Sequence, residues 1–261
     1  MDVRVGASDG APRGRYTRRP PLGAASHFVF RSGSRTLAAM GIRLRVWSCA
    51  LVLLSGCWGD ETVLFPPGLE PVTPVNEAVY PVGDAADPYP ERLEVALTYA
   101  EDVAGRPPSV HARGYVHAPL SAVWEALRTP DVSADRRNFE SYTVETDVEP
   151  EYDFSYRIHA VVQDIVAVRY TTTFRHGVFE GTVQDPVSIL EAWQKTEGST
   201  IIRELRGSAV ARAVTPDVTA IELMQFSRTP ASNHPDNEAY LRDVYDAVVA
   251  LSHGRPLPPT P

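Results

Sequence analysis

Apolar and polar residues alternate along much of the second half of the chain, which is the period of a β-strand with one buried face. The pattern predicts strands at residues 111–118, 141–148, 154–163, 166–175, 187–195, 200–214 and 218–227, with a tight turn at Gln163-Asp164. The last three segments are rich in β-branched residues, although their alternation is weaker. Consecutive strands with short connections favour one antiparallel sheet.

Three segments carry apolar residues at the spacing of a helix. They are residues 91–105, closed by Gly105 and Pro107; residues 120–127, which follow Pro119; and residues 236–252, which end before Gly254. An apolar sheet face needs a cover, and the long last helix is the obvious one. The order predicts an α+β fold in which a curved antiparallel β-sheet wraps around the C-terminal helix.

A set of apolar and aromatic residues would face the interior between the sheet and the last helix. These ligand-cavity candidates are Tyr142, Phe154, Tyr156, Ile158, Tyr170, Phe174, Met224, Phe226, Tyr240 and Val244. Small-molecule pockets are largely apolar with a few polar groups, which tyrosines provide. A chain of this length also needs a filled core, so a ligand cavity and a solid core are both open at this point.

The start of the chain differs in charge from the rest. Residues 1–45 carry a net charge of +7 and the remainder −15, which together give the formal −8. Residues 1–39 are rich in Arg, Gly, Ser and Pro, and we expect them to be disordered and to precede the true start at Met40. Arg43 and Arg45 then precede an apolar run, residues 46–54, that is too short for a membrane span of about 20 residues.

A basic flank, a short apolar run and small residues before a cut site are typical of a secretory signal peptide, here residues 40–56. The tetrad Leu54-Ser55-Gly56-Cys57 closely resembles the bacterial lipobox. The resemblance implies cleavage before Cys57, attachment of diacylglycerol to its thiol, and a membrane partner through this anchor. An uncleaved or soluble-secreted signal, and a buried Cys57, are the alternatives.

The resemblance to lipoproteins implies a location in the bacterial cell envelope, lipid-anchored and facing the periplasm. Trp58 stands where an Asp often signals retention in related lipoproteins, so the outer membrane is favoured over the inner one. Cys49 leaves with the signal peptide, and with Cys57 acylated no disulfide is available.

Prolines divide the rest of the chain. Those at 66, 67, 71, 74, 81, 88 and 90 predict residues 57–90 as an extended tether. Its aromatic residues (Trp58, Phe65, Tyr80 and Tyr89) offer the alternative that the segment docks onto the domain. The folded domain is expected at residues 91–254, followed by a disordered tail at 255–261.

The stretch from Gly114 to Leu127, GYVHAPLSAVWEAL, resembles the opening of START-like domains, also called SRPBCC or polyketide cyclase/dehydrase-like domains. With the element order, the resemblance covers about residues 109–252. It implies a helix-grip fold with a cavity between the sheet and the C-terminal helix, and a bound apolar small molecule or lipid. An enzyme of the cyclase/dehydratase kind and a cavity-free structural lipoprotein are the alternatives.

Motifs for other chemistry are missing from the sequence, which has no Walker loop, GxGxxG, HExxH or GxSxG. His111 and His117 share a strand face but lie about 20 Å apart, and are expected to be solvated. The acidic residues around Pro150 favour a solvated hairpin turn. The net negative charge argues against a nucleic-acid partner. We therefore predict no catalytic residue, metal or cofactor.

Overall fold

The computed structural model describes residues 60–98, 108–163, 167–229 and 234–259. Their elements, in chain order, are β1 (Leu93–Thr98), β2 (Ser109–Val116), α1 (Leu120–Leu127), α2 (Pro130–Ser133), β3 (Phe139–Thr146), β4 (Phe154–Gln163), β5 (Ala167–Gly181), β6 (Pro186–Gly198), β7 (Glu204–Thr215), β8 (Val218–Arg228) and α3 (His234–Ser252). Within these ranges, no helix is long and apolar enough to cross a membrane.

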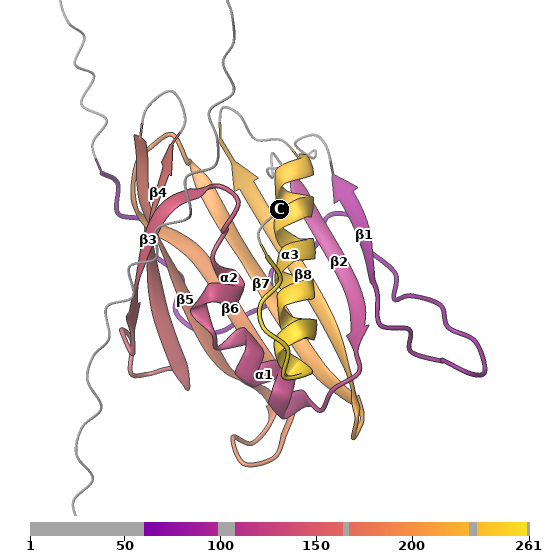
Figure 1. Cartoon of the computed structure of the whole chain (residues 1–261). Helices are drawn as coiled ribbons and strands as arrows, with labels where there is room; N and C mark the ends of the chain where they lie inside the picture. The colour runs from indigo at the N-terminus through magenta and orange to yellow at the C-terminus, as the bar shows by residue number, and fades with distance from the viewer. Residues whose placement is uncertain (1–59, 99–107, 164–166, 230–233, 260–261) are drawn as a thin grey trace, which may run out of the picture.

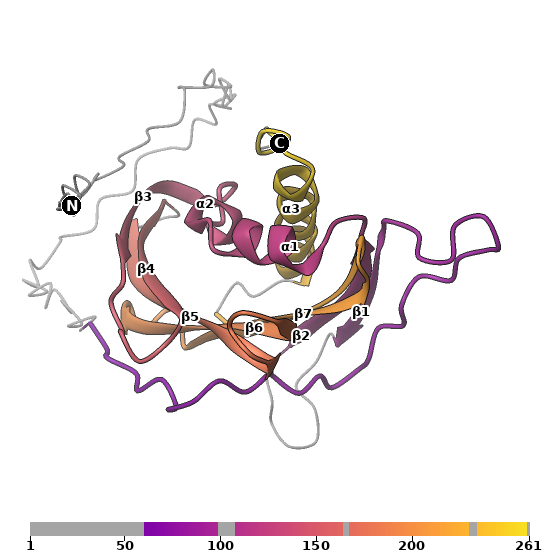
Figure 2. The same ribbon diagram turned by 90° about the horizontal axis from the view of Figure 1, so that it is seen from below.

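One sheet contains all eight strands in the order β1-β2-β8-β7-β6-β5-β4-β3, and every pairing is antiparallel. The sheet curves, and the helices lie on its concave side (Figures 1 and 2). The pairing of β2 with β8 brings the two ends of the domain together. This is the helix-grip arrangement, so the fold class expected from the sequence is confirmed.

The expected helix at residues 91–105 is wrong where the structure describes it. Residues Leu93–Thr98 form the edge strand β1, which pairs with β2 from Leu93 opposite Gly114 onward. Leu93, Val95 and Leu97 pack against the core, and their period of two is the strand signal that the helical spacing obscured. Residues 99–105 lie outside the described ranges.

A glycine in β2 determines how closely α3 approaches the sheet. A Cβ atom on Gly114 would lie 2.6 Å from the carbonyl oxygen of Arg92 and 3.1 Å from the ring of Tyr245. The Tyr245 hydroxyl donates a hydrogen bond of 2.6 Å to the carbonyl oxygen of Tyr115. The helix therefore packs directly on the strand backbone, and Leu241, Val244 and Val248 are buried below it.

Residues 60–90, named here the outer segment, lie along the convex face of the sheet (Figure 2). The guanidinium carbon of Arg175 lies 3.8 Å from the ring centroid of Phe65, and its Nη1 donates to the carbonyl of Pro66. Further along, the Val72 amide donates to Ser208 Oγ at 2.9 Å. Of the two alternatives left open by the sequence, the described part of this segment adopts the docked one.

The outer segment also buries His111, which corrects the expectation of a solvated side chain. The amide of Ala78 donates to His111 Nδ1 at 2.8 Å, so Nε2 carries the proton and donates to Glu222 Oε1 at 2.8 Å. His117 remains exposed. Around Pro150 the chain forms the expected turn, but Glu149 is not solvated, because it pairs with Arg175.

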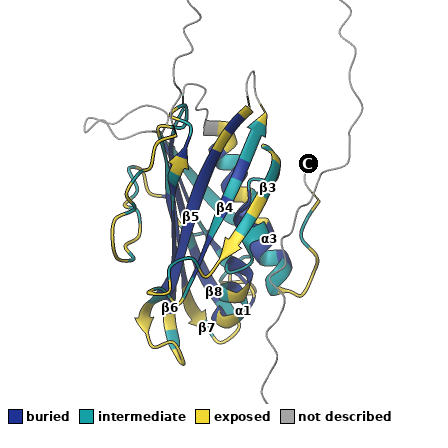
Figure 3. Ribbon diagram, turned by 90° about the vertical axis from the view of Figure 1, so that its left-hand side faces the viewer, coloured by how far each residue is buried: buried dark blue, intermediate teal, exposed yellow. Residues whose placement is uncertain are grey.

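Covers on both faces explain why strand alternation is weak in the middle of the sheet. Every residue of β6 from Ser188 to Trp193 is buried, as is every residue of the neighbouring β5 from Tyr170 to Gly177, whereas the edge strand β3 has no buried residue (Figure 3). When both faces of a strand are covered, successive residues are all buried, so apolar residues no longer alternate with polar ones along its sequence.

After α3 the chain returns along the domain. Leu257 packs against the core, and Arg136 Nη1 donates to the carbonyl of Pro258 at 3.0 Å. Residues 255–259 therefore contact the domain, which differs from the free tail that the composition favours.

Gly207 of β7 offers a test of this packing. A Cβ atom there would collide with the indole of Trp193 and the carbonyl oxygen of Met224. We expect Gly207→Ala to lower the free energy of unfolding by about 3 kcal/mol, as overpacking of a tight interior does. Urea denaturation measures this, with Ala213→Val on the exposed part of β7 as the control. Equal stability of the two variants would contradict the packing described.

Candidate functional site

A pocket opens between the concave face of the sheet and the N-terminal part of α3, and it encloses about 150 Å³. Its walls come from β3 to β8, from α2 and α3, and from the loops between them. The lining residues are Ser133, Asp135, Phe139, Ile158, Tyr170, Thr172, Phe174, Trp193, Ile202, Leu205, Gln225, Ser227, Thr229, Asp236, Asn237 and Tyr240. Five of these residues are aromatic, three are aliphatic and eight are polar, so the pocket combines flat apolar walls with many polar groups.

The ten predicted cavity residues fall into four groups. Ile158, Tyr170, Phe174 and Tyr240 line the pocket. Tyr156 and Val244 are buried in the core beside it. Tyr142 and Phe154 are half-buried: the Tyr142 hydroxyl donates to Asp131 Oδ1 at 2.6 Å, and Phe154 packs against Tyr156 and His176.

The last two candidates, Met224 and Phe226, are wrong, because they lie on the convex face of β8. Phe226 lines a hollow of about 280 Å³ together with Phe65 and Arg206. The outer segment covers this face, so apolar residues occur on both sides of β8 and its sequence does not show which side faces inward. Gln225 and Ser227 of the same strand point into the pocket instead.

Trp193, which the sequence reasoning also missed, lines both the pocket and the hollow on the convex face. It is buried on β6 opposite Gly207, whose missing side chain makes room for the indole. The alternation of Ile189, Glu191 and Trp193 is the sequence signal that could have placed it on the concave side.

A chain of hydrogen bonds fixes the polar end of the pocket. Trp193 Nε1 donates to Gln225 Oε1 at 3.3 Å, Gln225 Nε2 donates to Asn237 Oδ1 at 2.9 Å, and Asn237 Nδ2 donates to Ser227 Oγ at 2.7 Å. All four residues are buried. The chain joins β6, β8 and α3, so it holds the first turn of the helix on the sheet.

The charged residues that line the pocket are both acidic. Asp135 and Asp236 stand at its edge, and no Lys or Arg is among the lining residues that the structure describes. Burial raises the pKa of Asp135, although hydrogen bonds from the side chain and amide of Asn138 act in the opposite direction. The electrostatic environment therefore disfavours an anion in this pocket.

A buried polar cluster lies directly behind the pocket wall. Ser133 Oγ and the Tyr156 hydroxyl donate to Glu191 Oε1 at 3.1 and 3.0 Å, and His176 Nε2 lies 3.5 Å from the same oxygen. Ser133 also accepts a hydrogen bond at its carbonyl from Tyr240, which lines the pocket. A lone carboxyl between the inward positions of Ile189 and Trp193 was the sequence signal for this cluster.

Burial controls the ionisation of Glu191 and His176 in this cluster. It raises the pKa of Glu191 to about 8 and, with the charge of Arg128, lowers the pKa of His176 to about 3. At neutral pH the carboxyl is therefore largely protonated and the imidazole is uncharged, so the cluster carries little net charge.

The size of the pocket restricts what it can hold. About 150 Å³ is the volume that accepts a molecule the size of benzene. It lies below the roughly 300–1,000 Å³ of pockets for drug-sized ligands. Among the described residues, no cluster of His, Cys, Asp or Glu is arranged to hold a metal ion.

No protein-family profile matches the chain, and no curated protein matches it in sequence. Solved structures with a similar backbone include human STARD10, with 9% identity over 76% of this chain and 86% of that chain (TM-score 0.46). The human StAR-related lipid transfer protein 5 has 11% identity over 62% and 80% (TM-score 0.42). The Zhui aromatase/cyclase of a Streptomyces strain has 22% identity over 56% and 86% (TM-score 0.32).

The raised pKa of Glu191 predicts a pH-dependent stability. Its folded-state pKa of about 8 exceeds the ordinary value of 4.5, so the folded state binds more protons between these pH values. The free energy of unfolding therefore falls as pH rises, by about 1.4 kcal/mol per pH unit at the steepest. Below pH 6.5 the lowered pKa of His176 makes the free energy of unfolding rise with pH, which opposes the effect of Glu191. The decrease due to Glu191 is therefore measured between pH 6.5 and 8.

Glu191→Gln is the matched variant, because the amide keeps the shape and cannot ionise. We expect its unfolding free energy, measured by urea denaturation, to stay nearly level from pH 6.5 to 8 while that of the native protein falls. The same slope in both proteins would show that Glu191 does not ionise in this range.

Proposed function

We propose that this protein is a lipid-anchored binding protein whose helix-grip pocket holds a small apolar molecule without negative charge. The observation that carries the proposal is the pocket lining, which places Phe139, Phe174 and Trp193 around a space bordered by two carboxyl groups. Aromatic walls provide apolar contact area, and Tyr170 and Tyr240 add polar edges.

The size and charge of the pocket narrow the ligand further. A molecule with one ring or one short chain fits the volume, whereas a whole two-chain phospholipid does not. With Asp135 and Asp236 at the edge and no basic lining residue among those described, a fatty acid or phosphate would lack a counter-charge. A neutral hydroxyl or amide at the edge can bond to the carboxyl groups.

The membrane anchor is supported by the sequence alone. The lipobox-like tetrad ends at Cys57, three residues before the first described residue, and follows a basic flank and a short apolar run. From Cys57 onward the chain has a net charge of −15, which repels anionic headgroups. Acyl chains on Cys57, rather than a charged protein surface, would therefore hold the protein to the envelope, facing the periplasm.

A matched pair of probes tests the pocket. We expect benzyl alcohol to bind the native protein at least about tenfold more tightly than benzoate at neutral pH, a difference of about 1.4 kcal/mol. Titration calorimetry measures both affinities. Asp135→Asn should reduce the difference between the two affinities. Leu205→Trp, which fills the pocket, should lower the affinity for both probes. Val187→Trp, on the exposed hairpin, is the control and should leave both affinities unchanged. Equal binding of alcohol and carboxylate would refute the proposed charge selection.

Metabolic labelling tests the anchor. Cells that express the chain with radioactive palmitate should incorporate label into the native protein and none into Cys57→Ala. Cys49→Ala serves as the control, because that residue would leave with the signal peptide and its loss should not change labelling. Equal labelling of the native protein and Cys57→Ala would exclude lipidation at this cysteine.

A further inference from the structure

The outer segment is attached to the sheet from its first described residue. Asp60 forms a β-bridge with Ser199. The amide of Glu61 donates to the carbonyl of Gly198 at 2.9 Å, and the amide of Val63 donates to the carbonyl of Thr196 at 2.6 Å. These bonds occupy the edge of β6 beyond Gln194, where its pairing with β7 ends. The chain is thus fixed to the domain at residue 60, not only at residue 91.

Three lining residues of the pocket that are partly or fully exposed, Ile202, Thr229 and Asp236, lie at the same end of the sheet, and we assign them as its mouth. Ile202 belongs to the β6–β7 loop that contains Ser199, while Thr229 and Asp236 flank the connection from β8 to α3. The ends of β6, β8 and the start of β5 lie together at the top of Figure 1.

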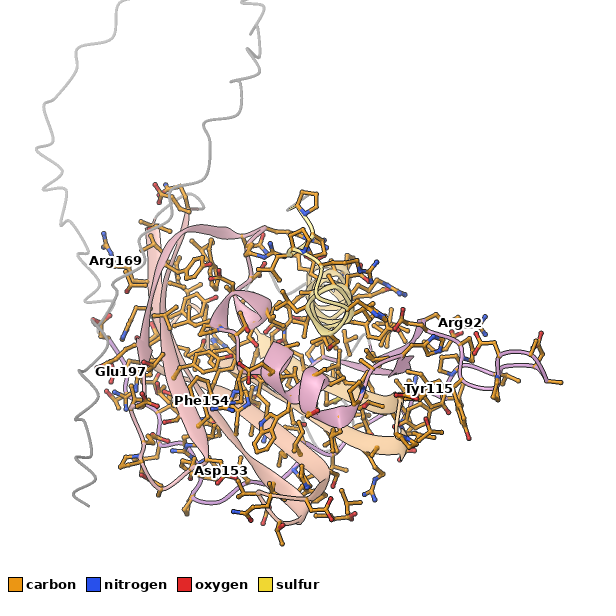
Figure 4. All side chains as sticks on the ribbon, turned by 60° about the horizontal axis from the view of Figure 1, so that its bottom comes forward. Arg92, Tyr115, Asp153, Phe154, Arg169 and Glu197 are labelled. Atoms are coloured by element: carbon orange, nitrogen blue, oxygen red, sulfur yellow. The ribbon has the colours of Figure 1, made fainter. Side chains whose placement is uncertain are left out.

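Tyr170 connects this end of the chain to the pocket. It pairs with Gly198 across β5 and β6, and it lines both the pocket and a surface hollow of about 780 Å³ that Asp60 borders. Arg169 and Glu197 border the same hollow and lie along one edge of the domain in Figure 4.

Covalent geometry then limits how far Cys57 can lie from the mouth. Cys57 and Asp60 are three positions apart in the chain, and a fully extended chain spans at most about 3.3–3.6 Å per residue, so Cys57 lies within about 10 Å of Asp60. The opposite end of the sheet is the hairpin between β5 and β6. Since β5 has 15 residues at about 3.3 Å each, that hairpin is up to about 45 Å away.

We propose that the end of the domain carrying the pocket mouth faces the bilayer that holds the acyl chains of Cys57, so that the ligand passes between the bilayer and the pocket without crossing bulk water. The inference rests on the proposed lipidation of Cys57. We assign the bilayer to this surface because the connection from Cys57 to Asp60 is too short to let any other end of the domain reach the membrane.

The charges at this end argue against a charged protein surface as the feature that sets the orientation. The exposed described residues near residue 60 carry both signs: Asp60, Glu61 and Glu197 are acidic, and Arg169 and Arg203 are basic. Such a mixed surface has no basic patch for anionic lipids. The orientation should therefore depend on the short connection alone.

The experiment uses the acylated full-length protein reconstituted into phosphatidylcholine vesicles that contain a spin-labelled quencher lipid. Thr200→Cys and Gln184→Cys each place one reactive thiol on an exposed position, the first at the mouth end and the second in the opposite hairpin. A maleimide fluorophore reports its distance from the bilayer. We expect strong quenching at position 200 and little or none at position 184.

A spacer variant is the matched control. Twenty Gly/Ser residues inserted between Gly59 and Asp60 should keep the protein on the vesicles but reduce quenching at position 200 several-fold, because the domain can then leave the surface. Equal quenching at both positions, or no effect of the spacer, would overturn the inference. A protein that does not float with the vesicles and whose Cys57 reacts with maleimide would instead overturn the proposed lipidation.

Discussion

The curved sheet of this domain has two apolar faces, and the chain must cover both of them. Helix α3 covers the concave face and the outer segment covers the convex face, so the two covers come from opposite ends of the described chain. The close approach of each cover depends on a missing side chain: Gly114 admits the ring of Tyr245 of α3, and Gly177 admits Leu69 of the outer segment. The folded domain therefore includes residues 60–90, because the sheet without its outer cover would expose Met224 and Phe226 to water.

The same burial controls the polar chemistry inside. Buried polar groups need partners, and here they find them in two sets that meet at the pocket wall. One set, from Trp193 to Ser227, holds the start of α3 on the sheet. The other surrounds Glu191 with donating hydroxyl groups, while burial keeps its carboxyl largely neutral by raising its pKa. The pocket is the remaining space between these sets, which explains why its walls are aromatic and its edge is polar.

The sequence predicted most elements because most strands show the period of two and α1 and α3 show clear apolar stripes. It failed at β1, where Leu93, Ala96 and Leu97 fit a helix as well as Leu93, Val95 and Leu97 fit a strand. It also failed at β8, because a strand that is covered on both faces is apolar on both and its inward side cannot be read from composition. The inward polar residues Gln225 and Glu191 were missed for a related reason: their role appears only when distant strands and helices meet.

Trp193 connects the two faces of the sheet, since this residue of β6 lines both the inner pocket and the outer hollow where Phe65 lies. A molecule in the pocket and the outer segment on the convex face are therefore separated by one layer of β-sheet. A shift of β6 at this residue that improves one contact would change the other, and such a coupling of the two occupancies would be reciprocal. Binding of a molecule in the pocket would then change how tightly the outer segment packs against the convex face of the sheet.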